Sequence, residues 1–558
     1  MKADPVLAEA LAAFERGELD RARAIVERQL ALEPDSPQLQ HVLGVIHCRA
    51  GDFEAGVEWL GRACDAEPGN IPFRLMLVRA LVDAGRTEDA LARAVRPCGT
   101  GPSDLALWHA RAEAAAAASD FVAAAEAWHA ICSAPGADWR AWLNLARSLL
   151  ALNRFDRAEA AYRAVLSARP GEADALRELG MIYDRTNRRE ALTELLDQAR
   201  ESGAGEAELA ELWAIRAHRE GRPNEARALL MKAEPTTDPV RWNRLRAKIA
   251  DAAGDPAEAF AAATAMNRAT PDHDDWRAKA ADYRRELRDT AAAITAEWAA
   301  ALPRLDPPER RPSAFLLGFP RSGTTLLDTF LMGHPAIVVI EEQGLLQAVA
   351  HDLGPMAELP GRLPAELSAA RDRYFALLDR RAAAGNTLAI DKAPLNLLLA
   401  PPIRCLFEGA PIIFVQRHPC DAVLSAFMQS FEPNLGMASF LDIADAADFY
   451  DVAMGLWAAS AEALPLNVHR VIYEELVRDP AAVLRPLLEF LGLGWDERVL
   501  DHRATAQARG TIVNTSYDQV VEPLSTAAAG RWKRYEQQLE PVLPVLLPWA
   551  ERLGYSDS

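Results

Sequence analysis

The 558-residue sequence contains no apolar run of about 18 residues, the length that a membrane-spanning helix needs. Its first residues, Met1-Lys-Ala-Asp-Pro, lack the apolar core of a signal peptide. An excess of positive charge is also missing. The formal net charge is −19, whereas general nucleic-acid-binding proteins are usually basic. We therefore expect a soluble, cytoplasmic protein with no membrane span and no nucleic-acid partner.

Closely spaced cysteines are missing as well. None of the six cysteines forms a CxxC pair, so we expect neither a disulfide framework nor a zinc site. Cys64, Cys98 and Cys132 follow one another at a constant step of 34, and we interpret them as one recurring small core position. Half of the residues are hydrophobic, which argues against a disordered chain. A chain of this length exceeds one core, so two or more domains are expected.

The first half of the chain has a 34-residue period. Small or turn-forming residues recur at this step, the last at a step of 33, at Gly17, Gly51, Gly85, Ser119, Asn153, Asn187, Gly221 and Gly254. Five residues after each turn stands a small residue, which lets two helices approach closely, except that Leu192 breaks the rule. Pro34, Pro68, Pro102 and Pro170 keep the same step and would end the second helix of their units. The pattern predicts eight helix–turn–helix units.

This period resembles that of the tetratricopeptide repeat over residues 5–272. The resemblance implies units that stack into a superhelix with a concave surface, which commonly holds peptides. A scaffold or an oligomerisation arm is the alternative. We place the repeat array at residues 1–273 and a capping helix with a Pro-rich linker at 274–311. One long helix is expected over 276–301, and a C-terminal domain over 312–558.

The segment Gly318-Phe-Pro-Arg-Ser-Gly-Thr-Thr325 lies between a strand-like apolar run and an apolar run with helical spacing. A strand, a Gly-bounded loop and a helix direct backbone N–H groups and a helix N-terminus to one point, which suits an anion. Gly318 and Gly323 have the spacing of the phosphate loop G-x-x-x-x-G-K-[ST]. However, Thr324 stands in place of its Lys, and the basic residue is Arg321. A tight turn without a ligand would give the same pattern.

Strand-like and helical runs alternate from Ser313 onward, which favours an α/β domain with a mainly parallel sheet. We therefore predict an all-α repeat superhelix followed by a phosphate-loop-like α/β domain. Ligands of such sheets lie beyond the C-terminal ends of the strands. Strands are expected at Ala314–Gly318, Ile337–Ile340, Thr387–Ile390, Ile412–Gln416 and Val468–Tyr473, and helices at Pro364–Ala384 and Asp421–Gln429.

A second candidate anion site follows the strand expected at 412–416. Arg417 comes directly after this strand, and Ser425 follows eight residues later in the first turns of a helix. A guanidinium fork together with a hydroxyl can hold a second phosphate. A surface ion pair for Arg417 and a buried helical position for Ser425 are the structural alternatives.

Phe319 to Thr325, taken together with Arg417 and Ser425, resembles the two cofactor motifs of sulfotransferases. That family uses 3′-phosphoadenosine 5′-phosphosulfate as its sulfate donor. The resemblance implies that the first loop cradles the 5′-phosphosulfate, that the Arg/Ser pair binds the 3′-phosphate, and that Tyr473 lies near the adenosine. The cofactor-binding residues that it implies are Pro320, Arg321, Ser322, Gly323, Thr324, Thr325, Arg417, Ser425, Tyr473, Ser516, Arg531 and Trp532.

Within this family the chain is most similar to the tyrosylprotein sulfotransferases. Glu341-Glu342 follows Arg321 by 20 and 21 positions, where that branch has its catalytic Glu at the second position. Asp391-Lys392 matches a Lys near the transferring group. Ser516, then Arg531-Trp532, resembles a C-terminal cofactor segment with a Ser and a Lys-Trp. That branch is membrane-anchored, luminal and disulfide-bonded, and this chain shows neither anchor nor secretory signal, so the acceptor is not inherited.

The resemblance implies transfer of a sulfuryl group to an acceptor hydroxyl. A peptide or protein tyrosine docked with help from the repeat groove is one candidate acceptor, and a glycan or a small molecule is the alternative. Glu342 is the candidate base, with Glu341 as runner-up. The alternative for Glu342 is a helix cap. Arg321 and Lys392 would stabilise the developing charge, and no metal is expected.

Two other interpretations of the second half remain open. A kinase of the phosphate-loop type would need a Lys at position 324 and an acidic Mg²⁺ ligand. A repeat scaffold with a non-catalytic nucleotide-binding domain would need no catalytic residues at all. His334 and His418 lie near the motifs without metal-ligand spacing, and we interpret both as structural.

Overall fold

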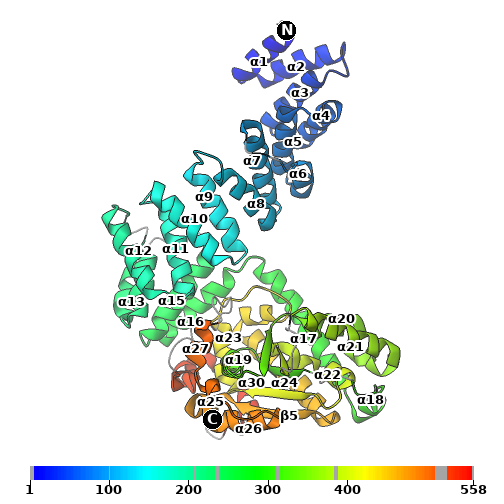
Figure 1. Cartoon of the computed structure of the whole chain (residues 1–558), viewed down its shortest axis with the longest axis vertical. Coiled ribbons are helices and arrows are strands. Elements are labelled where there is room, and N and C mark those ends of the chain that lie inside the picture. The colour runs from blue at the N-terminus through cyan, green and yellow to red at the C-terminus, as the bar shows by residue number, and fades with distance from the viewer. Residues whose placement is uncertain are drawn as a thin grey trace. The chain divides into compact units, whose positions relative to one another are not determined.

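The computed structural model of the protein describes residues 5–97, 99, 101–205, 209–232, 238–308, 313–381, 388–508 and 524–555. The chain forms two compact units, Met1–Leu212 and Trp213–Ser558. Within the described residues, all regular elements of the first unit are helices, and the sheet lies in the second unit (Figure 1). No helix in these ranges is long and apolar enough to cross a bilayer.

The first unit consists of consecutive helices that pack in pairs. Its elements are α1 (Pro5–Glu15), α2 (Leu19–Leu30), α3 (Pro37–Arg49), α4 (Phe53–Ala66), α5 (Ile71–Asp83), α6 (Thr87–Arg93), α7 (Pro102–Ala117), α8 (Phe121–Cys132), α9 (Trp139–Ala151), α10 (Phe155–Ala168), α11 (Ala173–Arg185) and α12 (Arg189–Glu201). Cys64 and Cys132 are buried, as expected for small core residues, and Cys98 lies outside the described residues.

The 34-residue period sets the turn within each helix pair. All eight turn positions lie in the left-handed region, with φ from 53° to 85°. This conformation ends a helix and favours Gly, while Asn and Ser tolerate it at some cost. The small residues five positions later are buried, and a Cβ on Gly56 would overlap Cys48. The period therefore specifies both the turn and the close helix contact.

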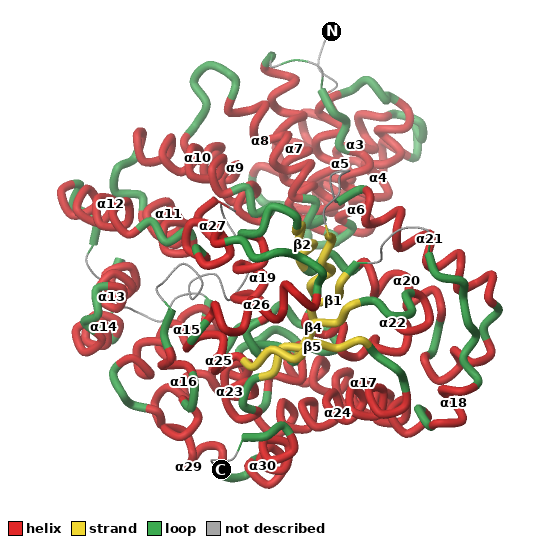
Figure 2. Tube along the Cα trace, turned by 60° about the horizontal axis from the view of Figure 1, so that its bottom comes forward, coloured by secondary structure: helices red, strands yellow, loops and turns green. Residues whose placement is uncertain are grey.

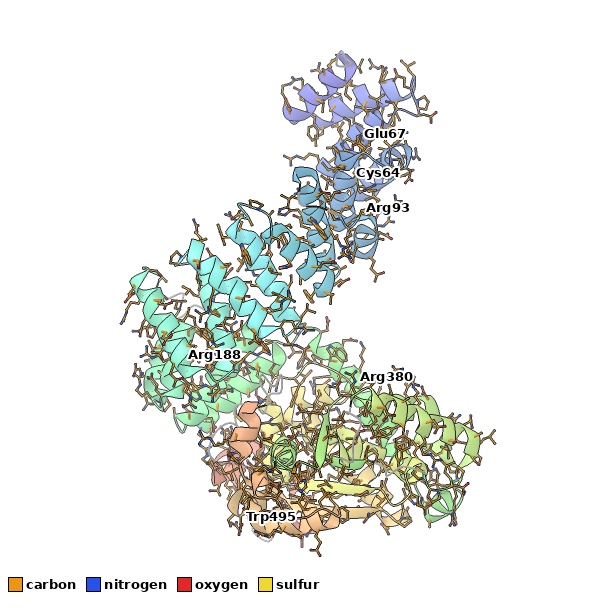
Figure 3. The ribbon with its side chains drawn as sticks, viewed as in Figure 1. Cys64, Glu67, Arg93, Arg188, Arg380 and Trp495 are labelled. Carbon is orange, nitrogen blue, oxygen red and sulfur yellow. The ribbon has the colours of Figure 1, made fainter. Side chains whose placement is uncertain are left out.

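Ion pairs also connect neighbouring repeats of the first unit. Arg93 of α6 lies 3.0 Å from Asp65 of α4, and Arg188 lies 2.5 Å from Glu159 of α10. Figure 3 labels the two arginines. Pairs of this kind at the surface contribute roughly 1 kcal/mol or less each, so the buried helix faces supply most of the stability.

The second unit begins with further helices before its sheet. These are α13 (Ala210–Arg219), which crosses the boundary, α14 (Pro223–Leu230), α15 (Pro239–Ala252), α16 (Pro256–Arg268), α17 (His273–Ala293) and α18 (Ala296–Ala300). The single helix expected over 276–301 is wrong, because α17 and α18 are separate. Thr295 is extended (φ −106°, ψ 171°) and its hydroxyl accepts from the Trp298 N–H, which starts a new helix.

Five parallel strands form the sheet in the order β2-β3-β1-β4-β5. They are β1 (Ala314–Gly318), β2 (Ile337–Glu341), β3 (Leu388–Lys392), β4 (Pro411–Gln416) and β5 (Asn467–Ile472). The parallel α/β prediction is confirmed. Strand β3 extends to Lys392 rather than Ile390, because Lys392 pairs with both Leu316 and Glu341. Thr387, the expected first residue of this strand, lies outside the described residues.

Helices cover both faces of the sheet (Figure 2). Phe315 and Leu317 of β1 face one apolar core, whereas Ala314 and Leu316 face the other. Strands buried on both faces are continuously apolar, as the β1 sequence is. The described α-helices that follow β1 in the chain are α19 (Thr324–Met332), α20 (Leu345–Leu353), α21 (Pro364–Asp379), α22 (Ala400–Leu406), α23 (Pro419–Phe427), α24 (Ile443–Ala463), α25 (Tyr473–Arg478), α26 (Pro480–Phe490), α27 (His502–Ala508), α29 (Glu536–Leu539) and α30 (Leu543–Arg552).

Candidate active site

Candidate residues stand at the C-terminal end of all five strands. Parallel strands bring these ends to one edge of the sheet, and the strand order reverses at β1. Crevices at such an edge are the usual ligand sites of open α/β sheets. The residues are Gly318 at the end of β1, Glu341 and Glu342 at β2, Lys392 at β3, Arg417 after β4 and Tyr473 after β5.

The loop between β1 and α19 has an unusual backbone that its sequence permits. Arg321 and Gly323 have φ values of 68° and 102°. A Cβ on Gly323 would overlap the ring of Tyr473, so this ring lies directly against the loop. Helix α19 begins at Thr324, and its first turn directs N–H groups without intrahelical acceptors toward the loop. Pro320, Ser322, Thr324 and Thr325 of this segment are all buried.

The structure brings the first motif and the second motif together. Arg321 donates from Nε to the Ser425 hydroxyl at 3.2 Å. Arg417 donates from Nη1 to the main-chain oxygen of Arg321 at 2.9 Å, and its guanidinium lies 4.7 Å from the centre of the Tyr473 ring. Residues that follow β1, β4 and β5 therefore converge with Ser425 of α23, and we call this group the anion site.

The charge of the anion site is positive. Burial, together with the nearby Arg417 and Arg531, lowers the pKa of Arg321 to about 10. The Nε–H groups of Arg417 and Arg531 are buried and have no hydrogen-bond partner among the described residues. Like charges repel and buried donors without acceptors are costly, and a bound anion relieves both. The anion site therefore fits a phosphate or sulfonate group.

The C-terminal segment 524–535 closes one side of the anion site. Asp421, in the first turn of α23, accepts from the backbone N–H groups of Gly530 at 2.7 Å and Trp532 at 2.8 Å. Arg417 donates from Nη2 to the Ala528 carbonyl at 2.6 Å. Arg531 is thereby brought to the site, with Trp532 buried beside it. Ser516 lies outside the described residues, so its implied role stays a prediction.

Lys392 is the centre of a second cluster at the same strand ends. Its Nζ lies 2.6 Å from Glu342, 3.1 Å from Glu341 and 3.4 Å from Asp328. The Lys392 side chain is fully buried, and burial alone would lower its pKa. The three carboxylates outweigh burial and raise this pKa, so the amine is held in the charged form. Thr325 of the loop lies 3.4 Å from the same nitrogen, which joins the cluster to the anion site.

Glu342 differs from its neighbour in exposure and backbone. The Glu342 side chain is 48% exposed, and that of Glu341 is 22% exposed. Nζ of Lys392 donates to Oε1 of Glu342. The φ of Glu342 is 49°, and its N–H donates to the Lys392 carbonyl at 2.7 Å. The helix-cap alternative is wrong, because α20 begins at Leu345 with Gly344 as its N-cap. Glu342 is thus both anchored and reachable from solvent.

The two histidines near the motifs have different surroundings, because His334 hydrogen-bonds through its ring and the His418 ring nitrogens are buried without a partner among the described residues. Nε2 of His334 forms a hydrogen bond with the Gly494 carbonyl, and Nδ1 accepts one from the Ala336 N–H. The His418 ring stacks on Trp532 with centroids 5.1 Å apart. Burial, with Lys533 and Arg417 nearby, lowers the pKa of His418 to about 4, so the ring is neutral near pH 7.

Three acidic residues of the site were missed from the sequence. Asp328 of α19 is fully buried beside Lys392, and Asp421 holds the C-terminal segment. Glu474 accepts from the His418 N–H at 2.9 Å and from the Tyr555 hydroxyl at 3.0 Å. An acid inside the apolar run of α19 was a detectable signal for Asp328. The partners of Asp421 and Glu474 are remote in sequence, so their roles had no local signal.

Comparisons with known proteins agree with these features. Residues 312–497 match the model of the sulfotransferase family. The second half of this chain carries a sulfotransferase domain. Residues 7–71 and 143–207 match the tetratricopeptide repeat model, so the domain follows an array of such repeats.

The relatives that the chain matches are distant. Protein-tyrosine sulfotransferase 1 of Danio rerio is 26% identical over 261 residues, which cover 44% of this chain and 72% of that protein. An uncharacterized protein of Aquifex aeolicus (strain VF5) is 27% identical over 286 residues, which cover 49% of this chain and 36% of that protein. The solved sulfotransferase domain of the Synechococcus PCC 7002 olefin synthase is 26% identical, covers 41% of this chain and 91% of that domain, and has a TM-score of 0.28.

Proposed function

We propose that the sulfotransferase domain transfers a sulfuryl group from 3′-phosphoadenosine 5′-phosphosulfate to an acceptor hydroxyl. The observation that carries this proposal is the anion site at the ends of β1 and β4, where Arg417 contacts the Arg321 loop and the segment that carries Arg531, and where the buried Nε–H groups of Arg417 and Arg531 lack acceptors among the described residues. A donor with two separated anionic ends supplies matching charge for such a cluster. The family match to residues 312–497 supports the same chemistry.

The geometry supports the following assignment of binding residues. The loop from Pro320 to Thr325, with the first turn of α19, would hold the 5′-phosphosulfate. Arg417 and Ser425 would bind the 3′-phosphate, since both side chains lie on the β4–α23 side of the loop. The Tyr473 ring lies against Gly323 and Arg417, and we assign it to the adenosine. Arg531 adds positive charge from the C-terminal segment.

When bound, the donor supplies an activated sulfuryl group whose S–O bond to phosphate is cleaved as a new S–O bond forms to the acceptor oxygen. Glu342 takes the proton of the acceptor hydroxyl, because its carboxylate is partly exposed and held in place by Lys392. Arg321 and Lys392 stabilise the negative charge that develops on the leaving phosphate. Thr324 and Thr325 add hydroxyl donors at the start of α19.

The acceptor that we favour is a tyrosine of a peptide or protein. Several of the relatives are protein-tyrosine sulfotransferases. The resemblance matches Glu342 and Lys392 to the Glu and Lys of that branch, and these two side chains lie 2.6 Å apart. The repeats that precede the domain are of a kind that commonly binds peptides, so they are the proposed docking surface.

The test is transfer of ³⁵S-labelled sulfate from the donor to a mixed peptide library, compared with the same library in which Phe replaces Tyr. We expect label on the Tyr library alone. If neither library is labelled and a glycan or small phenol is, the acceptor is a glycan or a small molecule and not a peptide tyrosine. Mg²⁺-dependent ATP turnover without sulfate transfer would replace the proposal with a kinase.

A further inference from the structure

A helix that precedes the sheet contacts the C-terminal segment beside the anion site. Helix α15 (Pro239–Ala252) carries Asp251 near its C-terminal end. The Oδ2 atom of Asp251 lies 3.0 Å from Nη2 of Arg531. Its Oδ1 atom accepts from the Tyr535 hydroxyl at 2.6 Å and from Arg534 Nη2 at 3.1 Å. One carboxylate therefore holds three side chains of the C-terminal segment.

The contact leaves a defined part of Arg531 available. Asp251 takes up Nη2, whereas Nε is buried and has no acceptor among the described residues. Arg531 stands between Gly530 and Trp532, whose N–H groups both donate to Asp421, and Arg417 donates to Ala528 three residues earlier, so this segment lies beside the anion site. The backbone beside Arg531 is held by Asp421 through Trp532. The arginine is thus fixed both at its backbone and at the end of its side chain.

We propose that Asp251 is a positioning residue of the nucleotide site, which fixes Arg531 so that its Nε–H is presented to an anionic group of the donor. This inference rests on the proposed function, because it needs a nucleotide at the anion site. It makes α15, a helix of the region predicted as repeats, a part of the binding machinery. The carboxylate acts through Arg531 and touches no reacting atom.

The negative charge of Asp251 has a second, opposite effect. A carboxylate near an anion site weakens binding by repulsion, which would make its removal favourable. However, Asp251 faces two guanidinium groups, Arg531 and Arg534, so its charge is compensated locally. An arginine without an anchor samples many rotamers, and the entropy of ordering it on binding is then lost. Positioning therefore outweighs repulsion.

Neighbouring helices are fixed to the same framework. Asn267 of α16 is 3% exposed, and its Nδ2 donates to the carbonyl groups of Phe427 at 3.0 Å and Phe440 at 3.2 Å. Phe427 ends α23, the helix that carries Ser425 and Asp421. A movement of α15 and α16 relative to the anion site would break these buried contacts, so Asp251 is a rigid anchor.

The test is a double-mutant cycle in the full-length protein, with calorimetric titration of 3′-phosphoadenosine 5′-phosphate. We expect Asp251→Ala and Arg531→Ala each to weaken binding roughly tenfold, and the double variant to bind no worse than Arg531→Ala alone. In turnover assays the KM for the donor should rise while kcat stays near that of the wild type. Asp251→Asn, a milder change, should show a smaller loss of the same kind.

Glu258→Gln is the matched control. Glu258 of α16 accepts from Nε of Arg246 in α15 at 2.6 Å, so its loss disturbs the same helix pair without touching segment 524–535. Its nucleotide affinity should equal that of the wild type. Unchanged or tighter binding by Asp251→Ala, or an equal loss in the Arg531→Ala background, would overturn the inference. A wild-type protein that does not bind the nucleotide would overturn the proposed function, and this inference with it.

Discussion

The Nη1 atom of Arg417 donates to the main-chain oxygen of Arg321 at 2.9 Å, so the residue after β4 supports the loop after β1. Its Nη2 atom donates to the Ala528 carbonyl at 2.6 Å and supports the C-terminal segment. Its Nε–H is buried and has no partner among the described residues. The planar guanidinium therefore joins three distant segments and keeps one donor for a ligand, which a lysine could not do.

Arg417→Ala should weaken the binding of 3′-phosphoadenosine 5′-phosphate roughly a hundredfold, because a charge-assisted contact to the 3′-phosphate is lost. The affinity for adenosine 5′-phosphate, which lacks that phosphate, should fall far less, and only because the loop is altered. Calorimetric titration of both nucleotides measures the ratio. The exposed Arg470 of β5 offers a control, and Arg470→Ala should bind both as the wild type does. Equal losses for the two nucleotides would remove Arg417 from the 3′-phosphate site.

Glu342→Gln should lower turnover by about 10²–10⁴, the usual contribution of a general base, while nucleotide affinity stays unchanged. The amide keeps the shape of the side chain but cannot take the acceptor proton. Glu341→Gln is the matched control, because Glu341 contacts the same Lys392 at 3.1 Å yet is less exposed. Single-turnover sulfate transfer is the measurement. If Glu341→Gln loses turnover and Glu342→Gln retains it, Glu341 is the general base and Glu342 is not.

Gly323→Ala should abolish measurable nucleotide binding. The position has a φ of 102° and its Cβ would overlap the Tyr473 ring, so the loop and the ring cannot both keep their places. Gly409 has a φ of 76°, but a Cβ there would meet no atom within 4 Å, so it isolates the backbone effect. Gly409→Ala should cost about 1 kcal/mol of stability and leave nucleotide affinity intact. Equal binding by both variants would show that the contact with Tyr473 is dispensable.

Asp391→Asn should stabilise the protein increasingly as the pH rises. Asp391 is 1% exposed and accepts from the Tyr374 hydroxyl at 3.1 Å, and burial raises its pKa to about 7. The unfolded chain releases this proton near pH 4, so the folded state binds more protons between about pH 4 and 7 and loses stability across that window. The neutral amide removes this loss.

Thermal unfolding of the wild type and Asp391→Asn between pH 5 and 8 measures the effect. The difference in Tm should already be present at pH 5, increase up to about pH 7 and then level off. A constant difference over this range would mean that Asp391 ionises in the folded protein as it does in the unfolded chain.

Much of the fold was predictable because its signals are local. Positive φ at Gly17 and Asn153 follows from the 34-residue step, and the strand ends were placed within two residues because apolar runs stop at polar site residues. The break between α17 and α18 was missed. The sequence on both sides of Ile294 is rich in alanine and charged residues, which have good helix propensity. Only Thr295, the N-cap of α18, signals that a new helix begins there.

The candidate site was predictable where its residues belong to motifs. The gathering of Arg321, Arg417 and Ser425 follows from the parallel sheet, which aligns all strand ends. The partners of Lys392 and Arg531 were not predictable. Asp328 lies on the inner face of α19, and Asp251 belongs to a helix that the period assigns to the repeats. No local pattern reports a contact between Asp251 and Arg531, which are so far apart in the chain.

By itself, the sequence determined the repeat period, the strand–loop–helix motif and the order of the polar strand ends, because each depends on neighbours no further away than one repeat. Only the tertiary structure decided which carboxylates surround Lys392 and that Asp251 of α15 holds Arg531. It also decided which hydrogen-bond donors at the anion site have no acceptor among the described residues. These features depend on distances between segments that packing brings together, and burial then gives the charges there their strength.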